Sequence, residues 1–337
     1  MDSLTQIILG AAVAEVVSGK KLGNKAPLWG AIAGTIPDLD VFIGFLYHPI
    51  DATLVHRGFS HSLLFAIIFS PMIAFVIHRV YKQKFSFQIW LRLFFFSIVT
   101  HPILDMFTNY GTQFFWPLDY RISFNTVFVV DPLYTIPFGI CLLIVLFLKP
   151  SNKWRSKINL FGIYYSFLYL IWGVAVKLFI LYNSTNYFSK TSYTVKNEIV
   201  TPMPLTSFYW MILCEDETNY YLGYKSIFKP FQSKEIDIIP KNQSKLDSLI
   251  WKGTNYSETL KRISNNYYNL ETKKDTVIFY DLRFGVVGKL TNNKFRKPIF
   301  SYEIIHKENV VVKVNRSRGN NLFRFVDFEA YLNSIFR

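Results

Sequence analysis

The chain has 337 residues, of which 51% are hydrophobic and 18% aromatic, and its formal net charge is +14. The basic charge comes without a nucleic-acid reader motif, so it does not predict a nucleic-acid-binding protein. The two cysteines, Cys141 and Cys214, are far apart and predict neither a disulfide framework nor a cysteine-based zinc site. Lysine and arginine are instead expected to mark cytoplasmic loops and segments beside anionic lipid.

The first apolar stretch, residues 3–18, is rich in alanine and glycine. It resembles a signal peptide, but the charged n-region is missing and Asp2 is acidic, so we expect no cleavage. A short helix packed against other helices is favoured. Lys20, Lys21 and Lys25 follow this helix.

Five more apolar segments follow, and most are near the roughly 20 residues needed to cross a bilayer. They cover residues 27–47, 61–78, 89–107, 131–148 and 159–182. Pro37 breaks the first of them, because proline lacks the backbone donor that a helix needs. We expect a polar loop at 48–60, an aromatic-rich connection at 108–130, and some segments that are re-entrant or half-buried.

Basic clusters indicate the topology of these segments. They lie at residues 20–25, 79–84 and 149–157, after the first, third and fifth segments. The positive-inside rule places all three in the cytoplasm. The loops at the other ends of the segments, and the tail after residue 182, are then expected on the outer side of the cytoplasmic membrane.

Residues 183–337 are more polar and predict a small α+β domain. Strands are expected at Tyr209–Cys214, Tyr220–Ser226, Val277–Asp281, Pro298–Ile305 and Val310–Val314, and helices at Tyr256–Tyr267 and Asp327–Phe336. The sequence thus predicts a mainly helical membrane domain over residues 1–182, with about five to six apolar helices, followed by an extracytoplasmic α+β domain of unknown role.

Acidic and imidazole side chains gather between residues 35 and 131, where five of the six histidines lie. Histidine and aspartate are ligands of zinc-type metals, and ionisable groups in membrane segments are costly and usually functional. The predicted topology brings these groups to one depth near the outer interface. The predicted metal ligands are Asp38, His56, His61, His101, Asp105 and Asp131.

Two pairs carry most of this prediction. His101 and Asp105 are spaced i,i+4, so both project from one face of a helix; the alternative is a hydrogen-bonded polar pair inside the bundle. His56 and His61 flank a turn that Gly58 permits, and at least one of them is expected to bind the metal. The alternative is an interfacial loop in which one histidine is solvated.

Asp38 and Asp40 point in different directions whether the backbone is extended or helical. One is therefore expected to bind metal, and Asp40 is predicted to act as bridge, general base or orienting group; helix capping after Pro37 is the alternative. Arg57 is predicted to hold an anionic substrate oxygen, or else to contact a lipid headgroup. Asp131 is equally compatible with a helix N-cap before Pro132.

These groups predict a metal-dependent hydrolase. A divalent ion, Zn²⁺ in the first place and Mn²⁺ or Mg²⁺ as alternatives, would activate a water against a phosphoester. One to three ions are expected, and the predicted partners are membrane lipid and a small-molecule or lipid phosphoester substrate. The alternative function is a non-catalytic membrane scaffold or regulator with a structural His/Asp metal site.

The same motifs resemble a family, the YdjM-like inner-membrane metal-dependent hydrolases, also described as LexA-binding, inner-membrane-associated hydrolases. The resemblance covers roughly residues 1–180. It is carried by Met1-Asp2-Ser3-Leu4-Thr5 with Gly10-Ala11-Ala12, by Gly34-Thr35-Ile36-Pro37-Asp38-Leu39-Asp40, by His56-Arg57-Gly58-Phe59-Ser60-His61-Ser62, and by Thr100-His101-Pro102-Ile103-Leu104-Asp105.

The family is in turn distantly similar to the all-helical zinc phospholipase C and S1/P1 nuclease fold, which uses a trinuclear zinc site with His-x-x-x-Asp pairs. By that resemblance His101 and Asp105 form such a pair, and His61 and Asp38 are further ligands. Many family members carry histidine where this chain has Gln6. Glutamine is a poor zinc ligand, so the departure implies a lower metal count.

Overall fold

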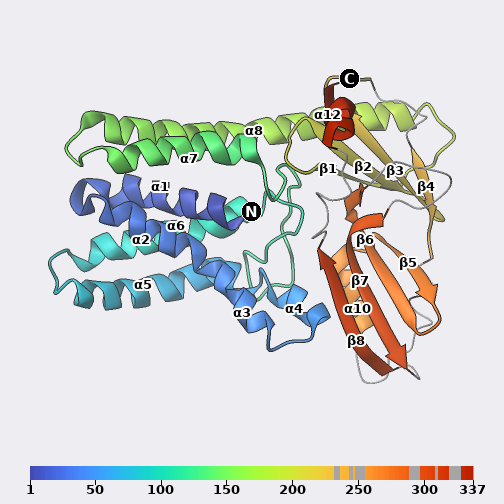
Figure 1. The fold of residues 1–337 in the computed structure, drawn as a ribbon, viewed down its shortest axis with the longest axis horizontal. Coiled ribbons are helices and arrows are strands. Elements are labelled where there is room, and N and C mark those ends of the chain that lie inside the picture. Colours follow the sequence, from blue (N-terminus) through green and yellow to red (C-terminus); the bar gives the residue numbers. More distant parts are fainter. Residues whose placement is uncertain are drawn as a thin grey trace. The chain divides into compact units, whose positions relative to one another are not determined.

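The computed structural model describes residues 1–230, 236–242, 246, 255–287, 297–307, 310–318 and 328–336 (Figure 1). The chain divides into two compact units. The helical unit consists of Met1–Leu46, Val55–Val174 and Pro204–Thr206, and the sheet unit of Tyr47–Leu54, Ala175–Met203 and Ser207–Arg337. We describe each unit by itself.

The helical unit is built mainly from long helices. They are α1 (Ser3–Leu22), α2 (Lys25–Thr35), α5 (Leu63–Val80), α6 (Phe87–Asp105), α7 (Pro132–Phe147) and the first part of α8 (Lys153–Phe188). Among the described residues, only α5, α6 and α8 are long and apolar enough to cross a membrane, and α7 is a shorter apolar helix. This is fewer than the five to six apolar helices expected, because α1 has 20 residues but is not apolar enough, α2 has only 11 residues, and α7 has only 16.

Small residues bring the backbones of α1 and α2 together. A Cβ atom on Gly10 would lie 2.3 Å from the carbonyl oxygen of Gly30, and one on Gly34 would lie 2.6 Å from the carbonyl oxygen of Gln6. On the α6 side of this helix pair, the Ser97 hydroxyl donates to the Gly10 carbonyl at 3.1 Å. Such close approach is typical of small residues in membrane helices, and it confirms that the first segment packs as a helix against its neighbours.

This close approach yields a stability prediction. We expect Gly10→Ala to destabilise the helical unit by about 1–3 kcal/mol or more, the range for overpacking a tight contact, because the new methyl group meets a backbone atom. Gly139→Ala is the matched control, since its Cβ would meet the flexible end of Ile8 at 3.0 Å. Thermal unfolding in detergent measures both, and equal midpoints would contradict the prediction.

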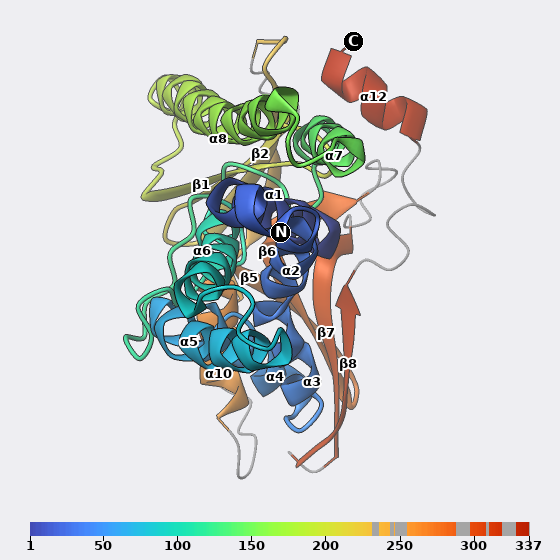
Figure 2. The same cartoon turned by 90° about the vertical axis from the view of Figure 1, so that its left-hand side faces the viewer.

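The two ends of the helical unit differ in charge. The α1–α2, α5–α6 and α7–α8 connections lie together at one end (Figures 1 and 2). These connections hold the three basic clusters, at residues 20–25, 79–84 and 149–157. We call this end the basic end. The segments that carry the acidic and histidine motifs lie at the other end, so the clusters segregate as the positive-inside argument requires.

The connection that was expected to be a polar loop is partly helical. Residues 48–60 contain α4 (Pro49–Val55) and the start of η2 (Phe59–His61). In α4, Ile50 is fully buried in the core of the sheet unit together with Phe279 and Tyr302. The sixth apolar segment also exceeds its predicted range, since α8 is one continuous helix of 36 residues.

The sheet unit holds two four-stranded antiparallel sheets, in the orders β1-β2-β3-β4 and β5-β6-β7-β8. Their strands are β1 (Asn197–Pro202), β2 (Tyr209–Glu215), β3 (Asn219–Ser226), β4 (Asp237–Pro240), β5 (Tyr268–Lys273), β6 (Thr276–Val287), β7 (Lys297–Lys307) and β8 (Val310–Arg318). The helices α10 (Tyr256–Ser264) and α12 (Phe328–Phe336) complete it.

All five predicted strands and both predicted helices of this region are present, although Asp327, the predicted start of the last helix, lies outside the described residues. The sequence did not predict β1, β4 and β5. These strands are short and contain polar residues or proline, as in the Asn-Glu-Ile-Val-Thr-Pro of β1, so their period-2 pattern is weak.

Candidate metal centre

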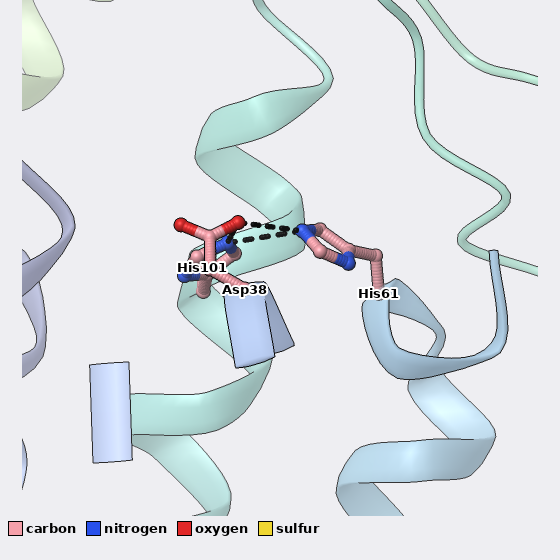
Figure 3. A group of neighbouring side chains, drawn as sticks. All are labelled: Asp38, His61 and His101. Atoms are coloured by element: carbon pink, nitrogen blue, oxygen red, sulfur yellow. Dashed lines mark hydrogen bonds and ion pairs between the residues drawn. The ribbon is translucent and has the colours of Figure 1, made fainter. Parts of the chain in front are cut away.

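Asp38, His61 and His101 direct one donor atom each at a common point (Figure 3). The Nε2 atoms of the two histidines are 3.2 Å apart. Oδ1 of Asp38 lies 3.3 Å from Nε2 of His61 and 3.5 Å from Nε2 of His101. Both histidines are buried, whereas the Asp38 side chain is 26% exposed. Solvent therefore has access to the cluster from the side of Asp38.

Asp105 adds a fourth donor. Its Oδ2 lies 3.5 Å from Nε2 of His61 and 3.8 Å from Nε2 of His101. This oxygen is buried and makes no hydrogen bond; it forms an ion pair with Nε of Arg57 at 3.2 Å. The other oxygen, Oδ1, accepts from Nε2 of Gln6 at 3.0 Å and contacts the amino group of Met1.

The spacing of these donors fits a small divalent cation. With metal–ligand bonds of about 2.0–2.1 Å, the donors of a tetrahedral zinc site are about 3.3 Å apart. The separations among Asp38, His61 and His101, at 3.2, 3.3 and 3.5 Å, are close to that value, and Oδ2 of Asp105 is somewhat farther out, at 3.5 and 3.8 Å from the two imidazole nitrogens. Two imidazole nitrogens and two carboxylate oxygens also match the chemistry that zinc prefers. The residues present therefore fit a metal ion.

The break in the second segment explains how His101 is held. Pro37 has no N–H to continue α2, which ends at Thr35 and gives way to η1 (Pro37–Leu39). Nδ1 of His101 pairs with the Gly34 carbonyl oxygen at 2.6 Å. A carbonyl can only accept, so Nδ1 carries the proton and Nε2 presents its lone pair to the cluster. A metal-bound histidine commonly donates its other ring N–H to a backbone carbonyl, which fixes the orientation of the ring.

Asp40, at the start of α3 (Asp40–Gly44), organises the histidine loop. Its Oδ2 accepts from the Ser60 hydroxyl at 2.6 Å and from the Arg57 amide at 3.1 Å, and lies 3.4 Å from Nδ1 of His61. Its Oδ1 pairs with Nδ1 of His56 at 2.7 Å. Asp40 therefore orients both histidines of the loop, and Ser60, which the sequence suggested only as a cap, supports the same arrangement.

Arg57 is buried beside the cluster and is only 4% exposed. Its Nε lies 3.2 Å from Oδ2 of Asp105, its Nη1 donates to the Thr108 hydroxyl at 2.9 Å, and its guanidinium lies over the ring of Tyr110. Its backbone φ of 63° is in the left-handed region, which places the turn between the two histidines. Arg57 thus balances the charge of Asp105, a contact that sequence spacing did not reveal.

Electrostatics favour a cation at this point. Burial alone would raise the pKa of Asp38, but hydrogen bonds to His101 and His61 hold it well below its ordinary value. Burial would also raise the pKa of Asp40, which its bonds to His56 and His61 lower. For His61, burial lowers the pKa but Asp38 and Asp40 raise it above its ordinary value. Positive charge is thus stabilised here, and metal binding would replace a proton.

Two predicted ligands lie outside the four-donor cluster. His56 is bound to Asp40 and its side chain is 30% exposed. Asp131 caps α7, accepting from the amides of Leu133 and Tyr134 and from the Tyr169 hydroxyl at 2.8 Å. The structure therefore gives Asp131 its alternative role as an N-cap, because its oxygens are engaged by α7 and α8.

The remaining histidines lie elsewhere. His48 stacks on Tyr256 in the sheet unit, with ring centroids 4.6 Å apart. His78 is near the basic end, where its Nδ1 pairs with the Phe85 carbonyl at 2.8 Å. Gln6, the residue that departs from the resembled family, lies beside the cluster and donates to the His101 carbonyl at 3.3 Å; its amide arranges Asp105 in place of a possible histidine ligand.

Comparison with known proteins agrees with the membrane character of the chain. A family model described as "YdjM inner membrane protein" matches residues 1–180. The uncharacterized protein YfhP of Bacillus subtilis is 26% identical over 140 residues, which are 39% of this chain and 42% of YfhP. Inner membrane protein YbcI of Escherichia coli is 32% identical over 121 residues, 33% of this chain and 67% of YbcI. No solved structure matches, so the likeness to phospholipase C and nucleases stays a prediction.

Proposed function

Because the chain belongs to the YdjM inner membrane protein family, we propose that it is a metal-dependent hydrolase of the cytoplasmic membrane that cleaves a phosphoester. One observation carries the proposal. Asp38, His61 and His101 place three donor atoms at metal-ligand spacing, although they come from separate segments of the chain, and Oδ2 of Asp105 lies beside them. Zn²⁺ suits this mixed nitrogen and oxygen set better than Mg²⁺, which prefers oxygen ligands and water.

Each residue at the site has a proposed task. A bound divalent ion supplies a water of lowered pKa and polarises a phosphoryl oxygen. Asp38, the most exposed donor of the four, borders the entrance. Asp40 holds Nδ1 of His56 at 2.7 Å, which leaves Nε2 of His56 as the nitrogen that exchanges a proton with water or leaving group. The main proposed task of Arg57 is to hold Asp105 in place. Because Arg57 is buried, we assign it less weight as a direct contact to substrate.

The surroundings of the site favour an amphiphilic substrate. Phe42, Phe45 and Leu46, directly after Asp40, are 65%, 78% and 85% exposed. In the 108–130 connection, Trp116 is 37% exposed and packs edge-on against Phe59, whose ring centroid is 5.0 Å away. Exposed aromatic and aliphatic side chains at the end of membrane helices are typical of the lipid interface. A lipid phosphoester is the proposed substrate class.

Hydrolysis of a chromogenic phosphodiester tests the function. The purified protein is stripped with chelator and assayed without metal and with Zn²⁺, Mn²⁺ or Mg²⁺, together with phospholipid substrates in mixed micelles. We expect activity only after metal is restored, and preserved activity in His78→Ala, a histidine change far from the site. Protein that binds metal but hydrolyses nothing would instead favour the scaffold with a structural metal site.

A further inference from the structure

A second polar site lies at the basic end, away from the donor cluster. A pocket of about 380 Å³ opens there between the last turns of α1 and the first turns of α6; Figure 2 faces this end of the helical unit. Its lining is Val16, Val17, Ser18, Lys20 and Lys21 of α1, and Ser86, Gln88, Ile89 and Arg92 at the start of α6. The proposed hydrolase does not use any of these residues.

The charge of the pocket has one sign. Lys20, Lys21 and Arg92 line it, and no acidic residue does. Among the described residues none of these three cations forms an ion pair or lies over an aromatic ring, whereas Lys25 and Arg79 at the same end lie over Tyr81 and Phe75. Three exposed cations around one cavity make its potential positive, which favours a bound anion.

Neutral donors reinforce this preference. Ser86 is the N-cap of α6, but its hydroxyl makes no capping hydrogen bond, which leaves it and the first-turn amides of the helix available to an anion. Gln88 adds a side-chain amide to the lining. The Ser18 hydroxyl is already engaged with the Ile89 carbonyl at 3.3 Å, so it closes the α1–α6 contact and adds no free donor to the pocket.

The pocket also has an apolar part. Val16, which is 51% exposed, and Val17 lie about one turn deeper along α1 than the lysines, and Ile89 lines the pocket from the first turn of α6. A free phosphate ion makes no favourable contact with apolar side chains. A phospholipid, by contrast, has a glycerol backbone and acyl chains below its phosphate. Basic pockets between membrane helices are known to bind such headgroups.

From these observations we propose that the pocket binds the phosphate headgroup of an anionic phospholipid in the leaflet at the basic end. The site is independent of the metal centre, and its failure would leave the proposed hydrolase untouched. Its ligand would anchor the α1–α6 pair, the same helices that carry Gln6, His101 and Asp105 at the other end.

The test compares two triple variants of the full chain. Lys20→Gln/Lys21→Gln/Arg92→Gln removes the cations of the pocket, and Lys82→Gln/Lys84→Gln/Lys153→Gln removes the same charge at the same end outside the pocket. Native mass spectrometry of protein in mixed micelles measures retention of phosphatidylglycerol against phosphatidylcholine. Cations near anionic lipid contribute roughly fivefold each, so we expect about a hundredfold loss of phosphatidylglycerol affinity where all three cations surround one headgroup. The control lysines surround no common pocket, so we expect the control variant to keep the preference for phosphatidylglycerol over phosphatidylcholine.

Further arms of this experiment decide the source of the phosphate and the integrity of the fold. Competition by inorganic phosphate at millimolar concentration that displaced the lipid fully would show a free-anion site and overturn the lipid assignment. Lys20→Arg/Lys21→Arg keeps the charge and is expected to keep binding, which separates lost charge from lost folding. Equal losses in the two triple variants, or no loss in either, would overturn the proposal.

Discussion

Replacing His61 or His101 by alanine is expected to remove bound metal from the purified protein. Each imidazole supplies a strong nitrogen ligand, and both rings are buried, so the alanine variant can offer at most a weaker water ligand in that place. Loss of a second-shell partner costs 10–100-fold in metal affinity, and we expect loss of a ligand to exceed about 100-fold. Elemental analysis and competitive zinc titration measure the change.

Two further variants separate ligands from orienting residues in the same assay. Asp40→Asn is expected to weaken metal binding by about 10–100-fold, because His61 and His56 lose the carboxylate that orients them. His56→Ala is expected to retain the metal, since His56 contacts Asp40 rather than the donor cluster. Unchanged metal content in both His61→Ala and His101→Ala would refute the site, and loss of metal in His56→Ala would restore His56 as a ligand.

The sequence predicted the core of this site because its signals are local. The i,i+4 spacing of His101 and Asp105 fixes their common face on α6. Pro37 predicts the helix break at Asp38, and Gly58 predicts the turn before His61. These residue types specify backbone geometry within one or two turns of helix, and the positive-inside topology then predicted that the separate segments meet at one end.

The residues that lie outside the cluster, and those that the sequence did not predict, depend on distant contacts. Asp131 has the composition of a ligand, but Tyr169, 38 positions away, completes its role as a cap. Ile50 lies in a stretch that reads as a polar loop, yet it is buried against strands more than 200 residues later in the sequence. No local pattern encodes such pairings. A single sequence therefore cannot decide between ligand and helix cap for Asp131, or between exposed loop and buried core for Ile50.

A buried ion pair between Arg155 and Glu15 is expected to contribute strongly to the stability of the helical unit. Arg155 was predicted only as part of a basic cluster, and Glu15 as a member of an apolar segment. In the structure, Nε and Nη2 of Arg155 donate to the two carboxylate oxygens of Glu15 at 2.7 and 2.8 Å, and its Nη1 donates to Asn24 and to the Leu148 carbonyl, both at 2.6 Å. The Arg155 side chain is 2% exposed and that of Glu15 is 5% exposed.

We therefore expect Arg155→Met to destabilise the helical unit by about 3–5 kcal/mol, because it leaves the carboxylate of Glu15 buried without a partner. Glu15→Gln/Arg155→Met removes both charges and should lose clearly less. Lys157→Met on the same helix is the surface control, at about 0.5–1 kcal/mol for an exposed cation over an aromatic ring. Equilibrium unfolding in mixed micelles measures all three. A single variant as stable as the parent, or a double variant as unstable as the single, would show that this pair does not hold α1 against α8.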